Sequence, residues 1–307
     1  MIKKTLCFTN PAYLSLRDRQ LSVQVEKTET TPGRVTTVPI EDIGVVVLEH
    51  RQITITHAAI AALLENEVTL ITCDERHMPV GLMLPLEGHT LQSERFQAQI
   101  EASLPLRKQL WQQTVECKIL NQASVLHVLH DTEVGCMKAW AKEVRSGDST
   151  NLEGRAAAYY WRNMFPEFDD FTRDAEGGFP NAMLNYGYAI LRAVVARALV
   201  SSGLLPTLGI HHHNRYNAYC LADDIMEPYR PFVDRRVVDV MRQLPGQEDL
   251  TPEVKRMLLT IPTLDVRIGG QRSPLMVAVA QTTASLAKCF LGETRKIIYP
   301  TIDGTLK

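Results

Sequence analysis

The chain has 307 residues, a formal net charge of −2 and 45% hydrophobic residues, which suits one large globular domain or two smaller ones. This charge excludes a strongly basic protein, so any DNA binding must come from a local basic patch. The six cysteines lie far apart without a Cys-x-x-Cys motif, which predicts reduced thiols in a cytoplasmic protein. We find no signal peptide and no apolar stretch of membrane-spanning length.

Short β-prone segments separated by turn residues fill the first 86 residues. Within them, His57–Glu67 has helical spacing of its apolar residues. Gly44–Leu48 is almost wholly apolar, as expected of a strand buried on both faces. The predicted strands are Lys4–Phe8, Tyr13–Arg17, Gln20–Val25, Arg34–Pro39, Ile43–Leu48, Gln52–Thr56 and Val68–Cys73, with Pro79–Leu86 as a last strand or an extended linker.

Helical periodicity dominates the rest of the chain. Asn181–Ser202 is apolar on most faces, which predicts a buried central helix that Gly203 caps. Thr251 is the expected N-cap of one later helix. Ser273 and Pro274 are the expected N-cap and first-turn proline of another. The predicted helices are Ser93–Ala102, Leu106–Asn121 with Val125–His130 as an extension, Thr132–Ser146, Thr150–Trp161, a helix from Asn217 that Pro228 ends, Pro231–Leu244, Pro252–Leu259 and one from Ser273 to Leu291.

Strands followed by helices predict an α+β chain in two segregated parts, not alternating βαβ units. We expect an N-terminal β-rich domain followed by a larger all-α C-terminal domain. The predicted boundaries are residues 1–86 for the β-rich domain, residues 87–92 for a linker that contains Glu-Gly-His, and residues 93–307 for the helical domain.

The segment Pro206–Arg230 concentrates ionisable side chains. Carboxylates together with imidazole suit a divalent metal, and arginines suit a phosphate beside it. On a helix, Glu227 shares a face with Asp223 or Asp224, whereas the histidines must reach the same point from a loop. The ionisable residues are His211, His212, His213, Arg215, Asp223, Asp224, Glu227 and Arg230.

Residue chemistry alone leaves two interpretations of this segment open. The first is a metal or catalytic site, and the second is a polar loop followed by a solvated helix face in which Glu227 pairs with Arg230. Glu153 is equally ambiguous, because Thr150–Glu153 fits a capping box in which the carboxylate turns back to the N-cap amide. Spacing does not decide between a cap and a metal ligand.

Four motifs in a characteristic order carry a family resemblance: Glu153–Trp161 (Glu-Gly-x-Ala-Ala-x-x-Tyr-Trp), Asn181–Leu191, Leu208–His212 and Ala222–Pro231. Together they resemble the integrase of CRISPR spacer acquisition, the Cas-one family, and most closely its type II members. The resemblance covers the whole chain, including the N-terminal strands and the Cys73–Gly81 junction.

The resemblance implies three residues that bind metal and act in catalysis: Glu153, His212 and Glu227. His212 matches because it lies three residues after Gly209, as in the family's Gly-x-x-His motif. The two neighbouring histidines do not match the ligand position, and the Asp223–Asp224 pair is at most supporting.

The activity implied by the resemblance is metal-dependent integration of foreign DNA fragments into a CRISPR array, with Mg²⁺ or Mn²⁺ as the cofactor. A 3′-hydroxyl attacks a phosphodiester at the repeat, and water in its place gives endonuclease activity. The implied partners are double-stranded DNA (prespacer and repeat), a second copy of the chain joined through the β domain, and the Cas-two adaptation protein in a heterohexamer.

Arginines close to this segment are candidate contacts to DNA phosphates, although ordinary surface ion pairs or turns explain each of them as well. They are Arg215, Arg230, Arg235, Arg236, and Arg267 and Arg272 on either side of Gly269–Gly270 in a flexible basic loop. Two other functions stay open for the whole chain: a non-catalytic DNA-binding scaffold, and a metal phosphohydrolase that acts on small phosphate esters.

Overall fold

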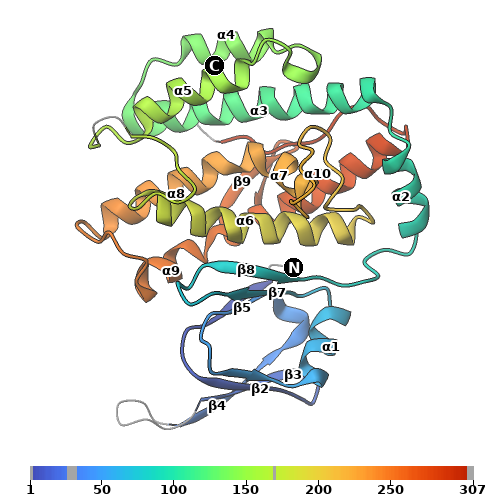
Figure 1. The fold of residues 1–307 in the computed structure, drawn as a ribbon, viewed down its shortest axis with the longest axis vertical. Coiled ribbons are helices and arrows are strands. Elements are labelled where there is room, and N and C mark those ends of the chain that lie inside the picture. Colours follow the sequence, from blue (N-terminus) through green and yellow to red (C-terminus); the bar gives the residue numbers. More distant parts are fainter. Residues whose placement is uncertain (1–2, 26–32, 169–170, 303–307) are drawn as a thin grey trace. The chain divides into compact units, whose positions relative to one another are not determined.

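The computed structural model describes residues 3–25, 33–168 and 171–302, and it divides into two compact units, Met1–Gly88 and His89–Lys307 (Figure 1). The division falls inside residues 87–92, which we assigned to a linker. The first unit is β-rich and the second is mostly helical, which confirms the predicted α+β class.

The described residues of the first unit form two four-stranded sheets and one α-helix. One sheet has the order β1-β5-β7-β8, in which β8 alone runs antiparallel to its neighbour. The other has the order β4-β3-β2-β6. The elements are β1 (Lys4–Phe8), β2 (Ala12–Arg17), β3 (Gln20–Val25), β4 (Arg34–Pro39), β5 (Ile43–Leu48), β6 (Ile53–Ile55), α1 (His57–Glu65), β7 (Thr69–Cys73) and β8 (Pro79–Met83).

The core of this unit lies where both sheets meet α1. Leu14 and Leu21 from one sheet pack with Val46 from the other and with Leu63 of α1, all fully buried. Five of the six residues of β5 are buried, as a strand covered on both faces requires. The apolar Gly44–Leu48 run therefore predicted its position correctly.

The second unit contains nine helices and one β-hairpin among its described residues. The helices are α2 (Gln92–Ile100), α3 (Leu104–His130), α4 (Gly135–Glu143), α5 (Leu152–Met164), α6 (Asn181–Ser201), α7 (Cys220–Met226), α8 (Arg230–Gln243), α9 (Pro252–Leu258) and α10 (Leu275–Phe290). The hairpin consists of β9 (Asp265–Ile268) and β10 (Gln271–Pro274).

Helix α3 is the long element around which this unit is arranged. It is one 27-residue helix, so the two predicted pieces are continuous. Its N-cap Ser103 accepts a hydrogen bond from the backbone N–H of Leu106, and Asp131 ends it in the left-handed conformation. Helices α4 and α5 pack on one side of α3, and α7 and α8 pack on the other (Figure 1).

Helix α6 forms much of the core of the second unit, as its apolar sequence predicted. With 21 residues and a mean hydropathy of 1.2 it does reach membrane-spanning length, contrary to our expectation. However, 78% of that apolar window is buried inside the protein, which is typical of a core helix. Gly203, at φ +66°, follows its last turn as predicted.

The region before α10 differs from the prediction. Ser273 and Pro274 belong to β10, so Ser273 is not the N-cap of α10 and Pro274 is the residue that precedes it. Gly269 and Gly270 form the hairpin turn with φ values of +57° and +82°, which a two-residue turn of this kind favours. The segment predicted as a flexible loop is therefore the turn of a β-hairpin. The second domain, which we expected to be all-α, thus contains one β element. The predicted N-cap Thr251 of α9 is confirmed.

Candidate active site

Two buried residues of α3, seven positions apart and on the same helix face, organise the candidate site. Trp111 contacts the histidine loop, and Lys118 contacts carboxylates from two other elements. The Lys118 Nζ atom lies 2.6 Å from Glu153 Oε1 and 2.6 Å from Glu227 Oε2. Glu153 and Glu227, two of the three predicted metal ligands, therefore both contact the Lys118 ammonium.

The start of α5 directs Glu153 towards Lys118. Its N-cap is Asn151, whose side chain accepts a hydrogen bond from Gly154 N–H. The Asp148 carboxylate accepts hydrogen bonds from the two preceding backbone N–H groups, those of Leu152 and of Glu153 itself, at 2.9 and 3.0 Å. The alternative interpretation of Thr150–Glu153 as a capping box is therefore wrong. Because other groups satisfy the amides, the Glu153 carboxylate is available for the ion pair with Lys118.

A tight turn presents Glu227. Pro228 does not end the helical path, because a 3-10 turn over Glu227–Tyr229 leads directly into α8. The Pro228 carbonyl accepts a hydrogen bond of 2.8 Å from the buried Asn121 side chain on α3. Arg230 Nε lies 3.1 Å from Glu227 Oε1. Burial raises the pKa of Glu227, but Arg230 and Lys118 lower it by more, so the net shift is downward and the side chain is a carboxylate.

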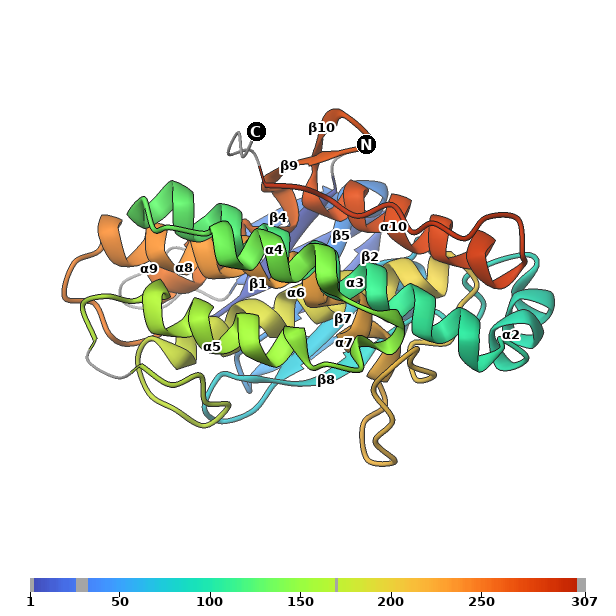
Figure 2. The ribbon, with the colours of Figure 1, turned by 90° about the horizontal axis from the view of Figure 1, so that it is seen from above.

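The Asp224 carboxylate holds the histidine loop in place. Its two oxygens accept the backbone N–H groups of Ile210, His211 and His212 at 2.7, 2.9 and 3.2 Å. Asp224 Oδ1 also lies 2.5 Å from His212 Nδ1, and this hydrogen bond is the main reason that the pKa of His212 is raised. Asp224 is fully buried, so it is a structural anchor of the loop. Figure 2 shows the segment between α6 and α7 projecting from the helices.

Gly209 allows the close approach of this loop to α7. A Cβ atom at this position would lie 2.3 Å from the carbonyl oxygen of His212 and 2.8 Å from Asp224 Oδ2. Both distances are far below van der Waals contact, so a side chain would displace the loop from its anchor. The glycine of the Gly-x-x-His motif is thus required for steric reasons.

The three consecutive histidines have different surroundings. The ring of His211 stacks on Trp111 with a centroid distance of 4.1 Å, and burial lowers its pKa. The ring of His212 meets Trp111 edge-on at 5.5 Å. All three side chains are exposed, and those of His212 and His213 border a cavity. Of the three side chains, His212 is the one bonded to Asp224.

The neighbouring Asp223 is directed elsewhere. Its carboxylate accepts hydrogen bonds from Arg192 Nε and from the Asn217 side chain, both at 2.7 Å. The carboxylates of Asp223, Asp224 and Glu227 therefore have three separate sets of partners, although they lie within five consecutive residues.

The predicted ligands fit a divalent metal by their chemistry. Within the described parts of the chain, no three His, Cys, Asp or Glu side chains are gathered as a metal site, and the Lys118 ammonium stands between the two glutamates. However, Glu227 Oε2, although it lies 2.6 Å from the Lys118 ammonium, is buried without a hydrogen bond of good geometry. The bond from Nδ1 to Asp224 leaves Nε2 of His212 as the nitrogen for a metal. Glu227 and Glu153 also contribute to the raised pKa of His212, which places all three groups in one electrostatic neighbourhood.

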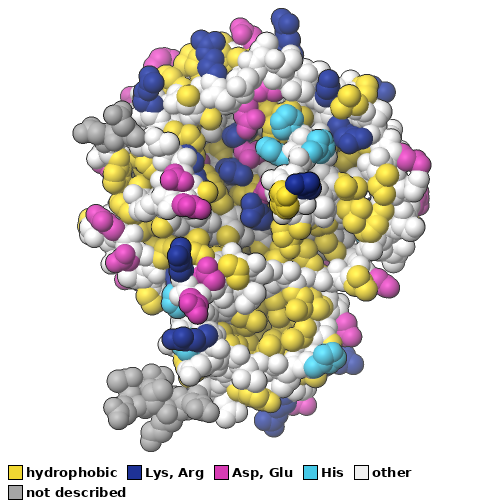
Figure 3. Space-filling view, in the orientation of Figure 1, with side chains coloured by type: hydrophobic (Ala, Val, Ile, Leu, Met, Phe, Trp, Pro, Cys, Tyr) yellow, Lys and Arg dark blue, Asp and Glu magenta, His cyan; other side chains and the backbone are white. Residues whose placement is uncertain are grey.

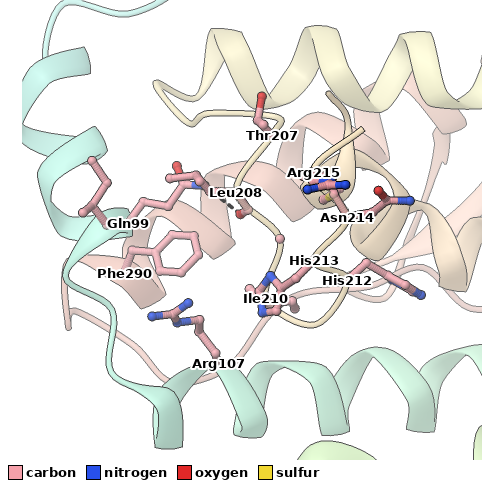
Figure 4. A pocket seen from close by; sticks show the side chains of 13 residues that line it. Gln99, Arg107, Thr207, Leu208, Ile210, His212, His213, Asn214, Arg215 and Phe290 are labelled. Carbon is pink, nitrogen blue, oxygen red and sulfur yellow. Dashed lines mark hydrogen bonds between the residues drawn. The ribbon is translucent and has the colours of Figure 1, made fainter. Parts of the chain in front are cut away.

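A cavity of about 430 Å³ borders the histidine loop. Figure 4 shows Arg107 from α3 and Phe290 from α10 on one side of it, and the loop from Leu208 to Arg215 on the other. On the face seen in Figure 3, histidine, acidic and basic side chains gather around α7. Arg107 is a cation at this cavity that the sequence analysis did not select.

The predicted DNA-binding arginines differ in how they are held. Arg230 is paired with Glu227, as the alternative interpretation expected, but the acidic helix face is buried and not solvated as that interpretation required. Arg236 donates to the carbonyl of Met257. Arg215 is exposed and lies over the ring of Tyr216.

The other three predicted arginines lie near the hairpin. Arg267 and Arg272 face each other across the two strands. Arg235 and Arg267 border a second cavity of about 200 Å³. Contact of any of the six with DNA stays a prediction.

Comparison with known proteins decides the family. The family model described as "CRISPR associated protein Cas1" matches residues 6–265. This chain belongs to the Cas1 family. It is 40% identical over 286 residues to the CRISPR-associated endonuclease Cas1 of Neisseria meningitidis serogroup C (strain 8013), covering 93% of this chain and 91% of that relative. The predicted resemblance is confirmed.

Solved structures share the fold of this Cas1-family chain. A casposase bound to an integration product matches with a TM-score of 0.80 and 21% identity, over 97% of this chain and 92% of the casposase. A chain of a Cas6-RT-Cas1–Cas2 complex matches with a TM-score of 0.73 and 20% identity, over 96% of this chain and 35% of that one.

Sequence reasoning missed the residues of α3 that assemble this site. The signal was present, because Lys118 lies on the face of α3 that also carries the apolar residues Trp111 and Val115. A lysine at a core position must find a carboxylate partner. Asp148 and Asn151 were missed because capping depends on where a helix starts, which the sequence leaves uncertain by one or two residues.

Proposed function

We propose that this protein is a metal-dependent DNA integrase and endonuclease that inserts DNA fragments into a CRISPR array. The observation that carries the proposal is the meeting of Glu153 and Glu227 at one buried cation position, close to a histidine that Asp224 holds. Membership of the Cas1 family supports it, as does the name of the Neisseria meningitidis relative, an endonuclease. The shared fold with a casposase bound to an integration product is consistent with it.

In this proposal Glu153, His212 and Glu227 hold Mg²⁺ or Mn²⁺, for which carboxylate and imidazole donors are suited. When bound by these residues, such an ion would supply Lewis-acid chemistry, polarising a phosphodiester and lowering the pKa of an attacking hydroxyl. Asp224 orients the His212 ring, and Arg230 keeps Glu227 charged. A DNA 3′-hydroxyl as the nucleophile gives strand transfer, whereas water gives hydrolysis.

Cations around the loop are the proposed contacts for DNA phosphates. Arg107 and Arg215 both line the cavity that His212 also borders, which supports a role for them in binding the DNA backbone close to the reacting phosphodiester. Arg235, Arg267 and Arg272 would extend this contact towards the hairpin.

The proposed assembly is a homodimer formed through the β-rich unit, joined to a Cas2 protein in a heterohexamer on prespacer and repeat DNA. Support comes from the shared fold with a chain of a Cas6-RT-Cas1–Cas2 complex.

A strand-transfer assay tests the function. A short duplex with free 3′ ends is incubated with a supercoiled repeat plasmid, the Cas2 partner and one divalent ion at a time. We expect joining with Mn²⁺ or Mg²⁺, none after chelation, and none for Glu227→Gln, while the exposed control Glu253→Gln joins normally. Activity on small phosphate esters with zinc alone would favour the phosphohydrolase instead. Tight DNA binding without joining under any ion would favour the scaffold.

A further inference from the structure

The Lys118 ammonium is the centre of a group of four charges, of which Lys118 and Glu227 are buried and Glu153 and Arg230 are half-buried. Two carboxylates, Glu153 and Glu227, and two cations, Lys118 and Arg230, neutralise one another. Lys118 is the member that contacts both glutamates, each at 2.6 Å. Its side chain is 11% exposed, and those of Glu153 and Glu227 are 23% and 6% exposed. Solvent therefore screens these ion pairs little.

A divalent ion held by Glu153 and Glu227 would need the same carboxylate oxygens that Lys118 contacts. Metal–oxygen distances of about 2.0–2.1 Å for Mg²⁺ are shorter than the 2.6 Å between the ammonium and each carboxylate oxygen, so both cations cannot lie between the same two oxygens. Two cations within about 4 Å of each other repel strongly where the dielectric constant is low. The ammonium and the metal therefore exclude each other from this position.

The two cations of the group differ in how freely they can leave. Lysine carries a compact charge on a flexible four-carbon stem, whereas the planar guanidinium of arginine is fixed by stacking and directional bonds. Arg230 lies over the ring of Tyr188, with 4.9 Å from its Cζ to the ring centroid. Of the two side chains, that of lysine is the more easily rearranged, and Arg230 keeps its contacts with Tyr188 and Glu227 when Lys118 moves.

We propose that Lys118 is the internal cation of the metal-free site, occupying the metal position between Glu153 and Glu227 until a divalent ion displaces it. The residue keeps the two carboxylates together in the empty site and sets the affinity for the metal by competing with it. Lys118 is thus a positioning residue that acts through its neighbours. The inference rests on the proposed function, in which both glutamates hold the metal.

Mn²⁺ binding in the absence of DNA tests this competition without any need for activity. The free Mn²⁺ signal in electron paramagnetic resonance gives the Kd for the wild type and for Lys118→Met, Lys118→Gln and Lys118→Arg. Glu153→Gln identifies which binding belongs to this site. Arg230→Met is the matched control, because it removes one positive charge from the same Glu227 but does not vacate the point between the glutamates.

We expect Lys118→Met and Lys118→Gln to bind Mn²⁺ at least about tenfold more tightly than the wild type, a change of about 1.4 kcal/mol. Lys118→Arg, which keeps the charge, should show no such gain. In chelator, the Met variant should melt at a lower temperature than the wild type because two carboxylates, one of them buried, lose the cation between them, and Mn²⁺ should reverse this loss. The Gln variant, which can still donate hydrogen bonds to both carboxylates, gives the same comparison of Kd values if the Met variant does not fold.

Unchanged or weaker Mn²⁺ binding by both neutral variants would overturn the proposal and leave Lys118 as an ordinary structural ion pair. An equal gain in Arg230→Met would also overturn it, because the effect would then come from net charge and not from occupancy. If the wild type shows no Mn²⁺ binding that Glu153→Gln removes, the proposed metal function itself fails.

Discussion

His212 Nδ1 lies 2.5 Å from Asp224 Oδ1, and the same carboxylate accepts the backbone N–H groups of residues 210 to 212. A buried residue of α7 therefore fixes both the ring and the backbone of a proposed metal ligand on a loop. Outer partners of this kind orient a ligating imidazole and select its free nitrogen. The loop has its own anchor, separate from the contacts of Glu153 and Glu227.

Removing the Asp224 charge should loosen this loop. In Asp224→Asn an amide NH₂ replaces one oxygen and faces N–H donors, so at least one buried hydrogen bond is lost. We expect the free energy of unfolding in urea to fall by about 1–3 kcal/mol, together with slower strand transfer. The exposed Asp249→Asn is the control and should match the wild type. Equal stability of the two variants would show that the loop does not depend on Asp224.

Single alanine substitutions of the three histidines should affect stability and activity differently. His212→Ala should abolish strand transfer. His211→Ala should keep most of it but lose about 0.5–1.5 kcal/mol of stability, the magnitude of an aromatic pair, because its ring stacks on Trp111. His213→Ala, at an exposed position, should resemble the wild type in both. The measurements are thermal unfolding and plasmid joining, and a similar loss of joining in all three variants would contradict the assignment of His212.

Glu153→Gln should abolish strand transfer while the protein still folds and binds DNA. Asn151 and Asp148 cap α5, so the start of the helix is unaffected. The ion pair with Lys118 is lost, although the carboxamide still accepts a hydrogen bond, and we expect a decrease of about 1–2 kcal/mol in stability. Melting temperature, DNA binding and joining are measured together. Normal joining by this variant would remove Glu153 from the proposed ligands.

The strands were predictable from sequence because their signals are local. The predicted bounds of β1, β3, β4 and β5 agree with the structure, since turn residues and apolar runs lie next to each other there. Helix α3 was predicted in two pieces because polar residues interrupt its apolar pattern. One of them, Asn121, is buried and bonds to the carbonyls of Pro228 and Pro300. Such partners are far away in the sequence, so no local pattern reveals them.

In the candidate site, too, local sequence motifs were predictable whereas partners far away in the sequence were not. The family motifs gave the three proposed ligands, but the groups that position them come from other elements. Lys118 lies 35 positions from Glu153 in the sequence, and no spacing rule connects them. Asp224 was considered as a metal ligand or a supporting residue, and its role as the anchor of the loop follows from four hydrogen bonds that only the fold brings together.

A second buried carboxylate, Asp234 on α8, lies outside the proposed ligand set. It accepts hydrogen bonds from the hydroxyl groups of Tyr160 on α5 and Tyr188 on α6. Burial raises the pKa of Asp234 to about 6 from its ordinary 3.8, although both tyrosines act in the opposite direction. One ionisable group thus joins three helices of the second unit.

The protein should therefore become less stable as the pH rises from about 4 to 7, because the buried Asp234 loses its proton. The folded protein holds this proton more tightly than the unfolded chain, so the stabilisation is complete below pH 3.8 and is lost as the pH passes through about 6. The difference between the two pKa values corresponds to about 3 kcal/mol. Asp234→Asn stays neutral, so its free energy of unfolding in urea, relative to the wild type, should rise by up to about 3 kcal/mol between pH 4 and 7. The half-buried Asp239→Asn on the same helix is the control, and parallel pH profiles for wild type and Asp234→Asn would refute the raised pKa.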